Sequence, residues 1–216
     1  MSDAEGSAGA SPRRWAGRTA DERIDERRRQ LLDAGYQLLG TEGASAVTVR
    51  AVTRLSGLSP RYFYESYASR EDLLRAVFDD RFAVIHQAVQ DAMVGADPGF
   101  DAQARASIDA TARCLEEDPR LGRALLRESL ADDTLRAYAE RALPEFVAGV
   151  ALRAVDVAAV AALDPAELQV LILAVSGVQV SLLLSWCEGL LPLRRGELVD
   201  KVVAVVAGIV GSAGLL

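Results

Sequence analysis

Residues 48–74 read TVRAVTRLSGLSPRYFYESYASREDLL. The stretch predicts two short helices joined by a tight turn at Gly57, with a longer helix following. Thr48 is typical of a residue that caps a helix N-terminus, and Ser59 followed by Pro60 indicates a second helix start. Gly57 can take the positive φ angle that such a turn requires. The layout predicts a helix-turn-helix.

The second short helix carries an unusual outer face. Phe63 and Tyr67 are expected to point inward, which leaves Arg61, Tyr62 and Tyr64 among the outward residues. A helix of this kind suits the major groove of double-stranded DNA, where arginine can bond the O6 and N7 atoms of guanine. The alternative is that either outer tyrosine belongs partly to the core.

Composition predicts an all-α protein. The chain has 216 residues, half of them apolar, and strand-like alternation of β-branched and aromatic residues is nearly absent. The formal net charge of −7 is unevenly distributed. Residues 1–75 hold 12 Arg against 11 acidic residues, a net charge of +1, and residues 76–216 carry a net charge of −8. Attraction to phosphates is therefore expected only in the first third. Charge alone fits equally well a solvated acidic surface without a polyanion partner.

The cysteines and the N-terminus predict a soluble, cytoplasmic protein. Cys114 and Cys187 are unclustered, which favours buried free thiols in a reducing compartment. The N-terminus lacks the apolar stretch of a secretory signal. The segment from Leu163 to Cys187 is strongly apolar, but polar residues such as Glu167 and Gln169 interrupt it, so no membrane span is expected.

The domain organisation follows from the periodicity. Residues 1–18 are expected to form a disordered tail, residues 19–75 the helix-turn-helix domain, and residues 76–216 a larger helical domain. The first helix should start at a capping box of Thr19 and Glu22 and stop at Gly43, and Gly35 within it indicates a close helix crossing. The later helices are expected at about residues 69–94, 100–117, 121–131, 134–157, 165–186 and 193–210, with a kink or boundary at Pro144.

The larger domain carries no catalytic constellation. His86 is the single histidine, and neither a metal-spaced Cys/His set nor a nucleophile or phosphate-loop motif occurs in the sequence. We therefore expect no enzyme, no cofactor and no metal. Helices 165–187 and 194–212 are apolar nearly all round, which predicts a homodimer through these two helices. A single deep core without dimerisation is the alternative.

From Arg27 to Phe78 the chain resembles the TetR family of transcriptional regulators. The matching features are a Leu-Leu-Asp-Ala first helix, Gly43, Thr48-Val49, Ser56-Gly57-Leu58-Ser59, Tyr64, Tyr67 and Arg70-Glu71-Asp72-Leu73-Leu74, all without gaps. The chain departs from the family pattern at Gly35, Val52-Thr53, Tyr67 and Arg70, changes that keep packing or charge.

The resemblance implies a set of DNA-binding residues: Thr48, Val49, Arg50, Ser59, Pro60, Arg61, Tyr62, Tyr64, Ser66 and Arg70. In the family pattern, Thr48 caps the first short helix and can meet a phosphate, and Tyr64 bonds the DNA backbone. Arg70 matches a phosphate-binding lysine. For Arg50 the resemblance favours a DNA contact over a merely solvated side chain.

The function expected from these features is a ligand-responsive transcriptional regulator that acts as a repressor. A dimer would bind a near-palindromic double-stranded operator and be released by a small, largely apolar effector. Two alternatives remain open: a helical adaptor that does not bind DNA, and a small helical enzyme.

Overall fold

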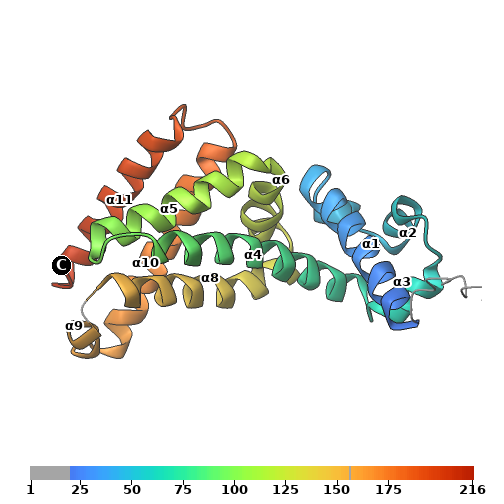
Figure 1. Ribbon diagram of the computed structural model, residues 1–216, viewed down its shortest axis with the longest axis horizontal. Helices are drawn as coiled ribbons and strands as arrows, with labels where there is room; N and C mark the ends of the chain where they lie inside the picture. The colour runs from blue at the N-terminus through green and yellow to red at the C-terminus, as the bar shows by residue number, and fades with distance from the viewer. Residues whose placement is uncertain (1–19, 156) are drawn as a thin grey trace, which may run out of the picture.

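The computed structural model describes residues 20–155 and 157–216, and all the regular structure in these ranges is helical (Figure 1). The proposed tail of residues 1–18 and the capping residue Thr19 lie outside the described ranges. The helices are α1 Ala20–Thr41, η1 Ala44–Ala46, α2 Val49–Ser56, α3 Pro60–Ser66, α4 Arg70–Val94, α5 Phe100–Glu117, α6 Pro119–Leu121, η2 Gly122–Arg127, α7 Glu128–Ala131, α8 Asp133–Ala154, α9 Val157–Ala161, α10 Pro165–Cys187 and α11 Arg195–Ser212.

Helices α1, α2 and α3 form the small domain at one end of the molecule (Figure 1). Phe63 and Tyr67 are buried beneath α3, as the sequence predicts. The Thr48 hydroxyl accepts the Ala51 N–H at 3.1 Å and so caps α2. Gly57 has a φ of 71°, the left-handed conformation that turns the chain from α2 into α3. The helix-turn-helix prediction is confirmed.

Helix α4 links the two domains. It begins beside α3, where the Ser69 hydroxyl accepts the Asp72 N–H, and it runs on into the body of the molecule (Figure 1). A Cβ added to Gly35 of α1 would lie 3.1 Å from the Leu73 side chain and 3.2 Å from that of Val77. The glycine therefore permits the close crossing of α1 and α4 that its place in the sequence indicates.

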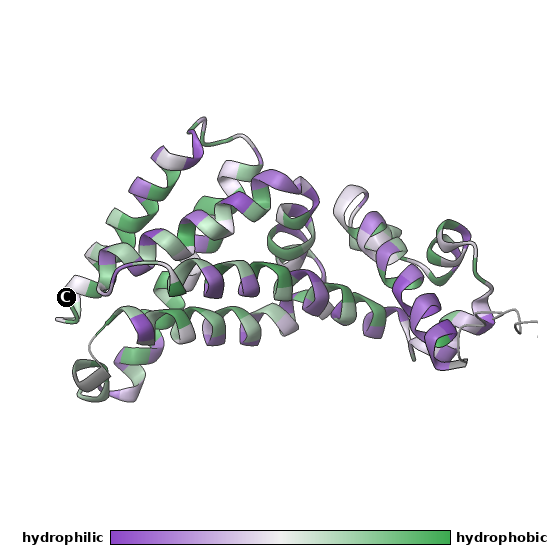
Figure 2. Cartoon of the chain, viewed as in Figure 1, coloured by the Kyte–Doolittle hydropathy of each residue, from purple (hydrophilic) through white to green (hydrophobic). Residues whose placement is uncertain are grey.

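In the larger domain α5 and α8 pack against α4, α10 packs against α5, α8 and α11, and α11 packs against α5 (Figure 1). Hydrophilic residues are dense on α1, whereas hydrophobic residues prevail along α11 (Figure 2). Pro144 lies inside α8, and the helix continues to Ala154, so of the two expected alternatives, a kink or a boundary, the boundary is excluded. The side-chain rings of Phe78, Phe82 and Phe146 contact one another in turn and tie α4 to α8.

The segment between α5 and α8 is helical but irregular. Residues 119–131 are one continuous helical run whose middle, Gly122–Arg127, is a π-helix. Wide helical turns of this kind are often found at functional positions. This run meets the C-terminal end of α1, where a Cβ added to Gly40 would lie 2.5 Å from the Cβ of Arg120 and 3.2 Å from its carbonyl oxygen.

Replacing Gly40 by alanine should therefore destabilise the protein despite the better helix propensity of alanine. Overpacking typically costs about 1–3 kcal/mol, against a propensity gain of about 1 kcal/mol. The matched control is Gly149→Ala in α8, where an added Cβ meets nothing within 4 Å. We expect Gly149→Ala to raise the free energy of unfolding in urea and Gly40→Ala to lower it. Equal effects of the two substitutions would show that α1 and α6 are not in close contact.

Candidate nucleic-acid interface

Helix α3 presents its polar side chains to solvent. The side chain of Arg61 is 83% exposed, and Tyr64 is 61% exposed although Phe63, one residue before it, is fully buried. Ser59 and Pro60 are also exposed, at the N-terminal end of the helix. Four of the predicted DNA-binding residues are therefore accessible, three of them at the start of α3 and Tyr64 one turn further along.

Ser59 occupies the capping position of α3, but its side chain makes no capping hydrogen bond. The helix starts at Ser59 and Pro60 as the sequence predicts, but without a hydrogen bond from the Ser59 side chain. Pro60 follows at the first helical position, where its missing N–H costs no hydrogen bond and its fixed φ suits a helix. The exposed hydroxyl is left without a capping role.

Tyr62 and Ser66 are less accessible. Tyr62 is half-buried, and the Arg27 guanidinium lies 4.5 Å from the centre of its ring. Ser66 is also half-buried, and its carbonyl accepts a hydrogen bond from Arg28 at 2.6 Å. Two arginines of α1 thus contact the less exposed side of α3, so α1 contributes to the position of this helix.

Helix α2 supplies the neighbouring part of the surface. Thr48, Arg50 and Arg54 are exposed. Val49 is partly buried and packs against the core, so what it offers at the helix start is its backbone N–H rather than its side chain. Within residues 48–66 the basic side chains are Arg50, Arg54 and Arg61, which makes this face locally cationic.

Arg70 points away from this face. Its guanidinium donates to the carbonyl oxygens of Val47, at 2.8 Å, and Ala44, at 2.7 Å, and contacts Asp132 at 3.3 Å. The resemblance implies a phosphate contact for Arg70, but in this structure its charged group is engaged within the protein. The physical reason is that α4 starts beside carbonyl groups of the α1–α2 connection that need donors.

A second set of residues binds the same connection from the other domain, and the sequence analysis missed it. Glu128 is 8% exposed, and its carboxylate accepts the Ala44 N–H at 2.8 Å. Arg123 donates to the Thr41 carbonyl at 2.7 Å. The sequence does hold a signal for Glu128. It follows Leu125 by three residues and Leu121 by seven, a helical spacing that places a carboxylate on the apolar face of its helix.

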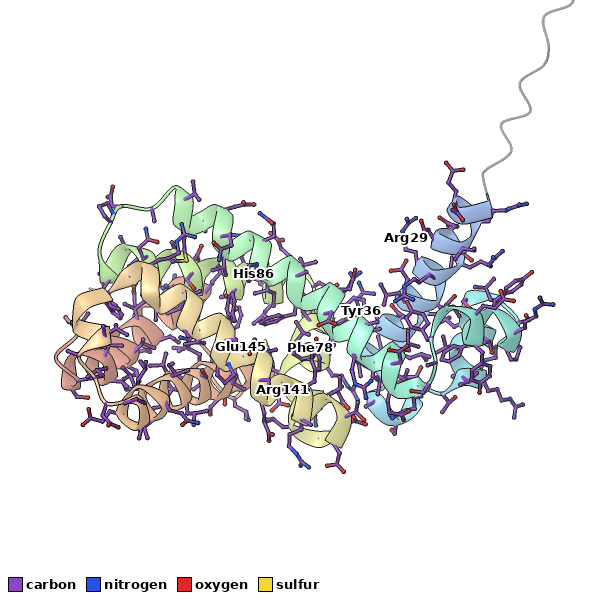
Figure 3. All side chains as sticks on the ribbon, turned by 90° about the horizontal axis from the view of Figure 1, so that it is seen from below. Arg29, Tyr36, Phe78, His86, Arg141 and Glu145 are labelled. Atoms are coloured by element: carbon purple, nitrogen blue, oxygen red, sulfur yellow. The ribbon has the colours of Figure 1, made fainter. Side chains whose placement is uncertain are left out.

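A third contact joins α1 to the second domain, at the junction between the two domains. The Tyr36 hydroxyl donates to Asp118 at 2.8 Å, and Arg120 binds the same carboxylate, which lowers the pKa of Asp118. Burial, with the bond to Asp118, raises the pKa of Tyr36. Figure 3 places Tyr36 and Phe78 near the middle of the molecule, where α1 and α4 meet the second domain, and Arg29 farther out along α1.

The other polar residues considered in the sequence are not gathered into a site. His86 is exposed, with its ring centre 5.6 Å from that of Phe146. Cys114 is half-buried and Cys187 is exposed, so the expectation of two buried thiols is wrong for Cys187. Over the described residues no group of three or more His, Cys, Asp or Glu side chains has the arrangement of a metal site.

Comparison with known proteins agrees with this geometry. Residues 31–77 match the family described as "Bacterial regulatory proteins, tetR family". An uncharacterised HTH-type transcriptional regulator of Haemophilus influenzae is 27% identical over 125 residues, which are 57% of this chain. The match spans 60% of that relative's length.

Solved structures share the whole fold. A putative transcriptional regulator from Pseudomonas aeruginosa superposes with a TM-score of 0.68 at 15% identity, covering 88% of this chain and 93% of the other. The FadR transcriptional regulator from Bacillus subtilis, solved with stearoyl-CoA, superposes with a TM-score of 0.65 at 14% identity, covering 82% and 96%.

The fold and the exposed face of α3 define a helix-turn-helix domain of the DNA-binding kind at the N-terminal end of the molecule. Residues 31–77 match the TetR-family model, and the whole chain is similar in fold to solved TetR-like regulators.

Proposed function

We propose that this regulator is a repressor that binds a near-palindromic operator as a homodimer in the cytoplasm and is released by a small, largely apolar effector. Two observations together carry this proposal. The first is the exposed surface of α2 and α3 around Arg50, Arg54 and Arg61, called here the reading face. The second is an uncharged cavity in the second domain. The two features lie in different domains joined by the contacts around Ala44.

The proposed DNA contacts follow from exposure. Arg61 and Tyr64 project from α3 towards a major groove, and Arg50 and Thr48 meet the flanking phosphates. Ser59, Pro60, Tyr62, Ser66 and the Val49 N–H lie close to these four and complete the proposed surface. Arg70 is assigned to the protein interior rather than to DNA, because its donors are engaged with Ala44, Val47 and Asp132.

Arg61→Ala should weaken binding to the region upstream of the chain's own gene in a gel-shift titration. Loss of a bidentate arginine–guanine contact costs about 1–3 kcal/mol, and Tyr64→Phe should cost less because it removes one hydroxyl. The control is Arg141→Ala on α8, an exposed arginine of the second domain. Binding should also fall as salt is raised. Failure to bind this region or any pool of palindromic duplexes would favour the adaptor alternative.

The exposed side of α10 supports the proposed dimer. Val170, Leu173, Gly177 and Ser181 recur at helical spacing and are all exposed in the single chain. On α11, Gly208 is exposed as well, and a Cβ added there or at Gly177 would meet nothing within 4 Å. By length and composition α10 could also cross a membrane, with 17% of its most apolar window buried. A second copy would cover this side and let small residues approach closely.

Sedimentation velocity should show a dimer, and Leu173→Arg should dissociate it. Burying an unpaired charge costs several kcal/mol, which weakens the dimer on the order of a hundredfold or more. The control Val94→Arg places the same charge on an exposed apolar position at the end of α4. A wild-type chain that sediments as a monomer would rule out the dimer through α10 and α11, as would a Leu173→Arg variant that remains dimeric.

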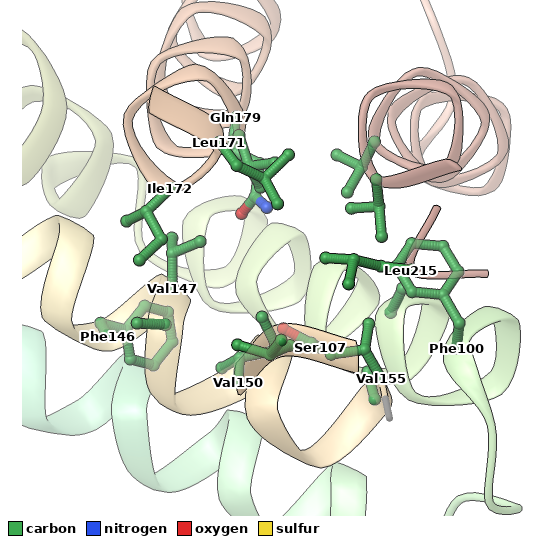
Figure 4. Close-up of a pocket in the computed structure, with 18 of the residues that line it drawn as sticks. Phe100, Ser107, Phe146, Val147, Val150, Val155, Leu171, Ile172, Gln179 and Leu215 are labelled. Carbon is green, nitrogen blue, oxygen red and sulfur yellow. The ribbon is translucent and has the colours of Figure 1, made fainter. Parts of the chain in front are cut away.

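The cavity of the second domain is the proposed effector site (Figure 4). It has about 130 Å³ of free space between α5, α8, α10 and α11, and it is partly open to solvent. Among the described lining residues none is charged, and the polar ones are Ser107 and Gln179. Phe100 and Phe146 lie on its walls. This lining suits an apolar chain or ring with one neutral polar group.

Helix α10 connects the cavity to the domain junction. Its middle lines the cavity through Val175 and Gln179. At its end, Glu188 forms an ion pair with Arg127 of η2 at 3.3 Å. Because η2 leads directly to Glu128, a shift of α10 on ligand binding would reach the Ala44 contact. An effector that binds one arrangement better than the other would thereby change DNA affinity.

A neutral chain should bind this cavity better than a charged one of the same length. We expect 1-decanol to raise the melting temperature more than decanoate does, since the cavity offers no partner for a carboxylate. A probe at about 100 times its Kd stabilises the fold by about 2.7 kcal/mol, roughly 5–10 °C in this size range. Ala151→Trp should fill the cavity and abolish the shift, whereas Ala161→Trp on α9 is exposed and should keep it. An equal response to decanoate would contradict a neutral effector.

A further inference from the structure

One acidic residue, Glu65, belongs to the exposed surface of α3 beside the arginines of the reading face. Between Thr48 and Ser66 the sequence contains three arginines and a single acidic residue, Glu65. A surface that served phosphate attraction alone would have no use for a carboxylate here, because the negative charge weakens attraction to DNA. Glu65 therefore needs a separate explanation.

Glu65 is bound to the arginine proposed to read the bases. The Nε–H of Arg61 donates to Oε1 of Glu65 at 2.8 Å, and both side chains are exposed, 83% for Arg61 and 44% for Glu65. This bond uses the Nε–H, so the two terminal nitrogens of the Arg61 guanidinium take no part in it and lie at the end of the side chain. Those nitrogens are a pair of donors that can bond O6 and N7 of guanine together.

Helix stability does not explain the pair. Arg61 stands in the first turn of α3 and Glu65 in the last. The helix dipole favours acidic residues near the N-terminus and basic residues near the C-terminus, and this pair has the opposite arrangement. Exposed ion pairs also contribute little in free solution. The pair would become stronger once DNA excluded water from it.

We propose that Glu65 is a positioning residue that sets base specificity by holding Arg61 extended, with its terminal nitrogens directed at a guanine. This inference rests on the proposed DNA-binding function. When Arg61 bonds guanine end-on, Glu65 still accepts from Nε and keeps a partner. When Arg61 turns to a phosphate, Glu65 is left unpaired beside a polyanion, which penalises binding to the wrong sequence.

The experiment is selection from a pool of randomised DNA duplexes with the full-length chain, followed by titration of the enriched duplex and of versions with single base-pair changes. Four proteins are compared: the wild type, Arg61→Ala, Glu65→Gln and Glu42→Gln. Glu42 is an exposed glutamate directly after the C-terminal end of α1, outside α2 and α3. Replacing it by glutamine changes the charge of the protein by the same amount as Glu65→Gln. Melting temperatures establish that the variants are folded.

We expect the wild type to enrich a motif with one G·C pair that Arg61→Ala no longer prefers. Glu65→Gln should lose about tenfold of the discrimination at that same pair. Its binding to unrelated DNA should become tighter and more salt-dependent, because Arg61 is free to contact a phosphate. Glu42→Gln should keep the wild-type preference at that pair.

Two results would overturn the inference, and they differ from each other. If Glu65→Gln keeps the wild-type base preference and salt dependence, Glu65 does not position Arg61, and DNA binding itself still stands. If the wild type enriches no sequence, the proposed function fails and the inference fails with it.

Discussion

The position of the reading face depends on how one residue between α1 and α2 is bound. The Ala44 N–H donates to the buried carboxylate of Glu128, and the Ala44 carbonyl accepts from Arg70. Both polar groups of a short irregular connection are thus satisfied by charged side chains, which form the stronger kind of hydrogen bond. Arg70 also meets Asp132, so α4 and the second domain act on the same point. Removing Glu128 would leave the Ala44 N–H without this acceptor, and removing Arg70 would leave the Ala44 carbonyl without this donor; an unsatisfied buried group costs about 1–3 kcal/mol.

Gly43 makes this arrangement possible. It has a φ of 96°, a value that side chains other than glycine rarely adopt, and an added Cβ would lie 2.9 Å from the Glu128 carboxylate. The sequence suggests Gly43 as the stop of the first helix, and the structure gives it a second role as the place where the carboxylate approaches the backbone. The glycine and the glutamate are 85 residues apart, so their relation exists only in three dimensions.

Local physics explains what the sequence could predict. Helical periodicity, Gly57 and the pattern of Phe63 and Tyr67 depend on neighbours within a few residues, and these predictions hold. What the sequence could not show arises where distant groups compete for the same atoms. Arg70 is drawn inward by the carbonyl groups of Val47 and Ala44, and the π-helix at Gly122–Arg127 lies where that run packs against α1, α4 and α10. The cavity likewise forms between helices whose mutual packing no single segment determines.

The exposed stripe of α10 has a consequence for the life of the newly made chain. Until another surface covers Val170 and Leu173, the folded monomer offers an uncharged apolar face of the type that chaperones and proteases bind. In the dimer proposed above, chains that find a partner would be withdrawn from this surveillance and single chains would be cleared. The amount of protein in the cell would then be limited by the rate at which single chains meet, and α10 would set the lifetime of the protein as well as its assembly.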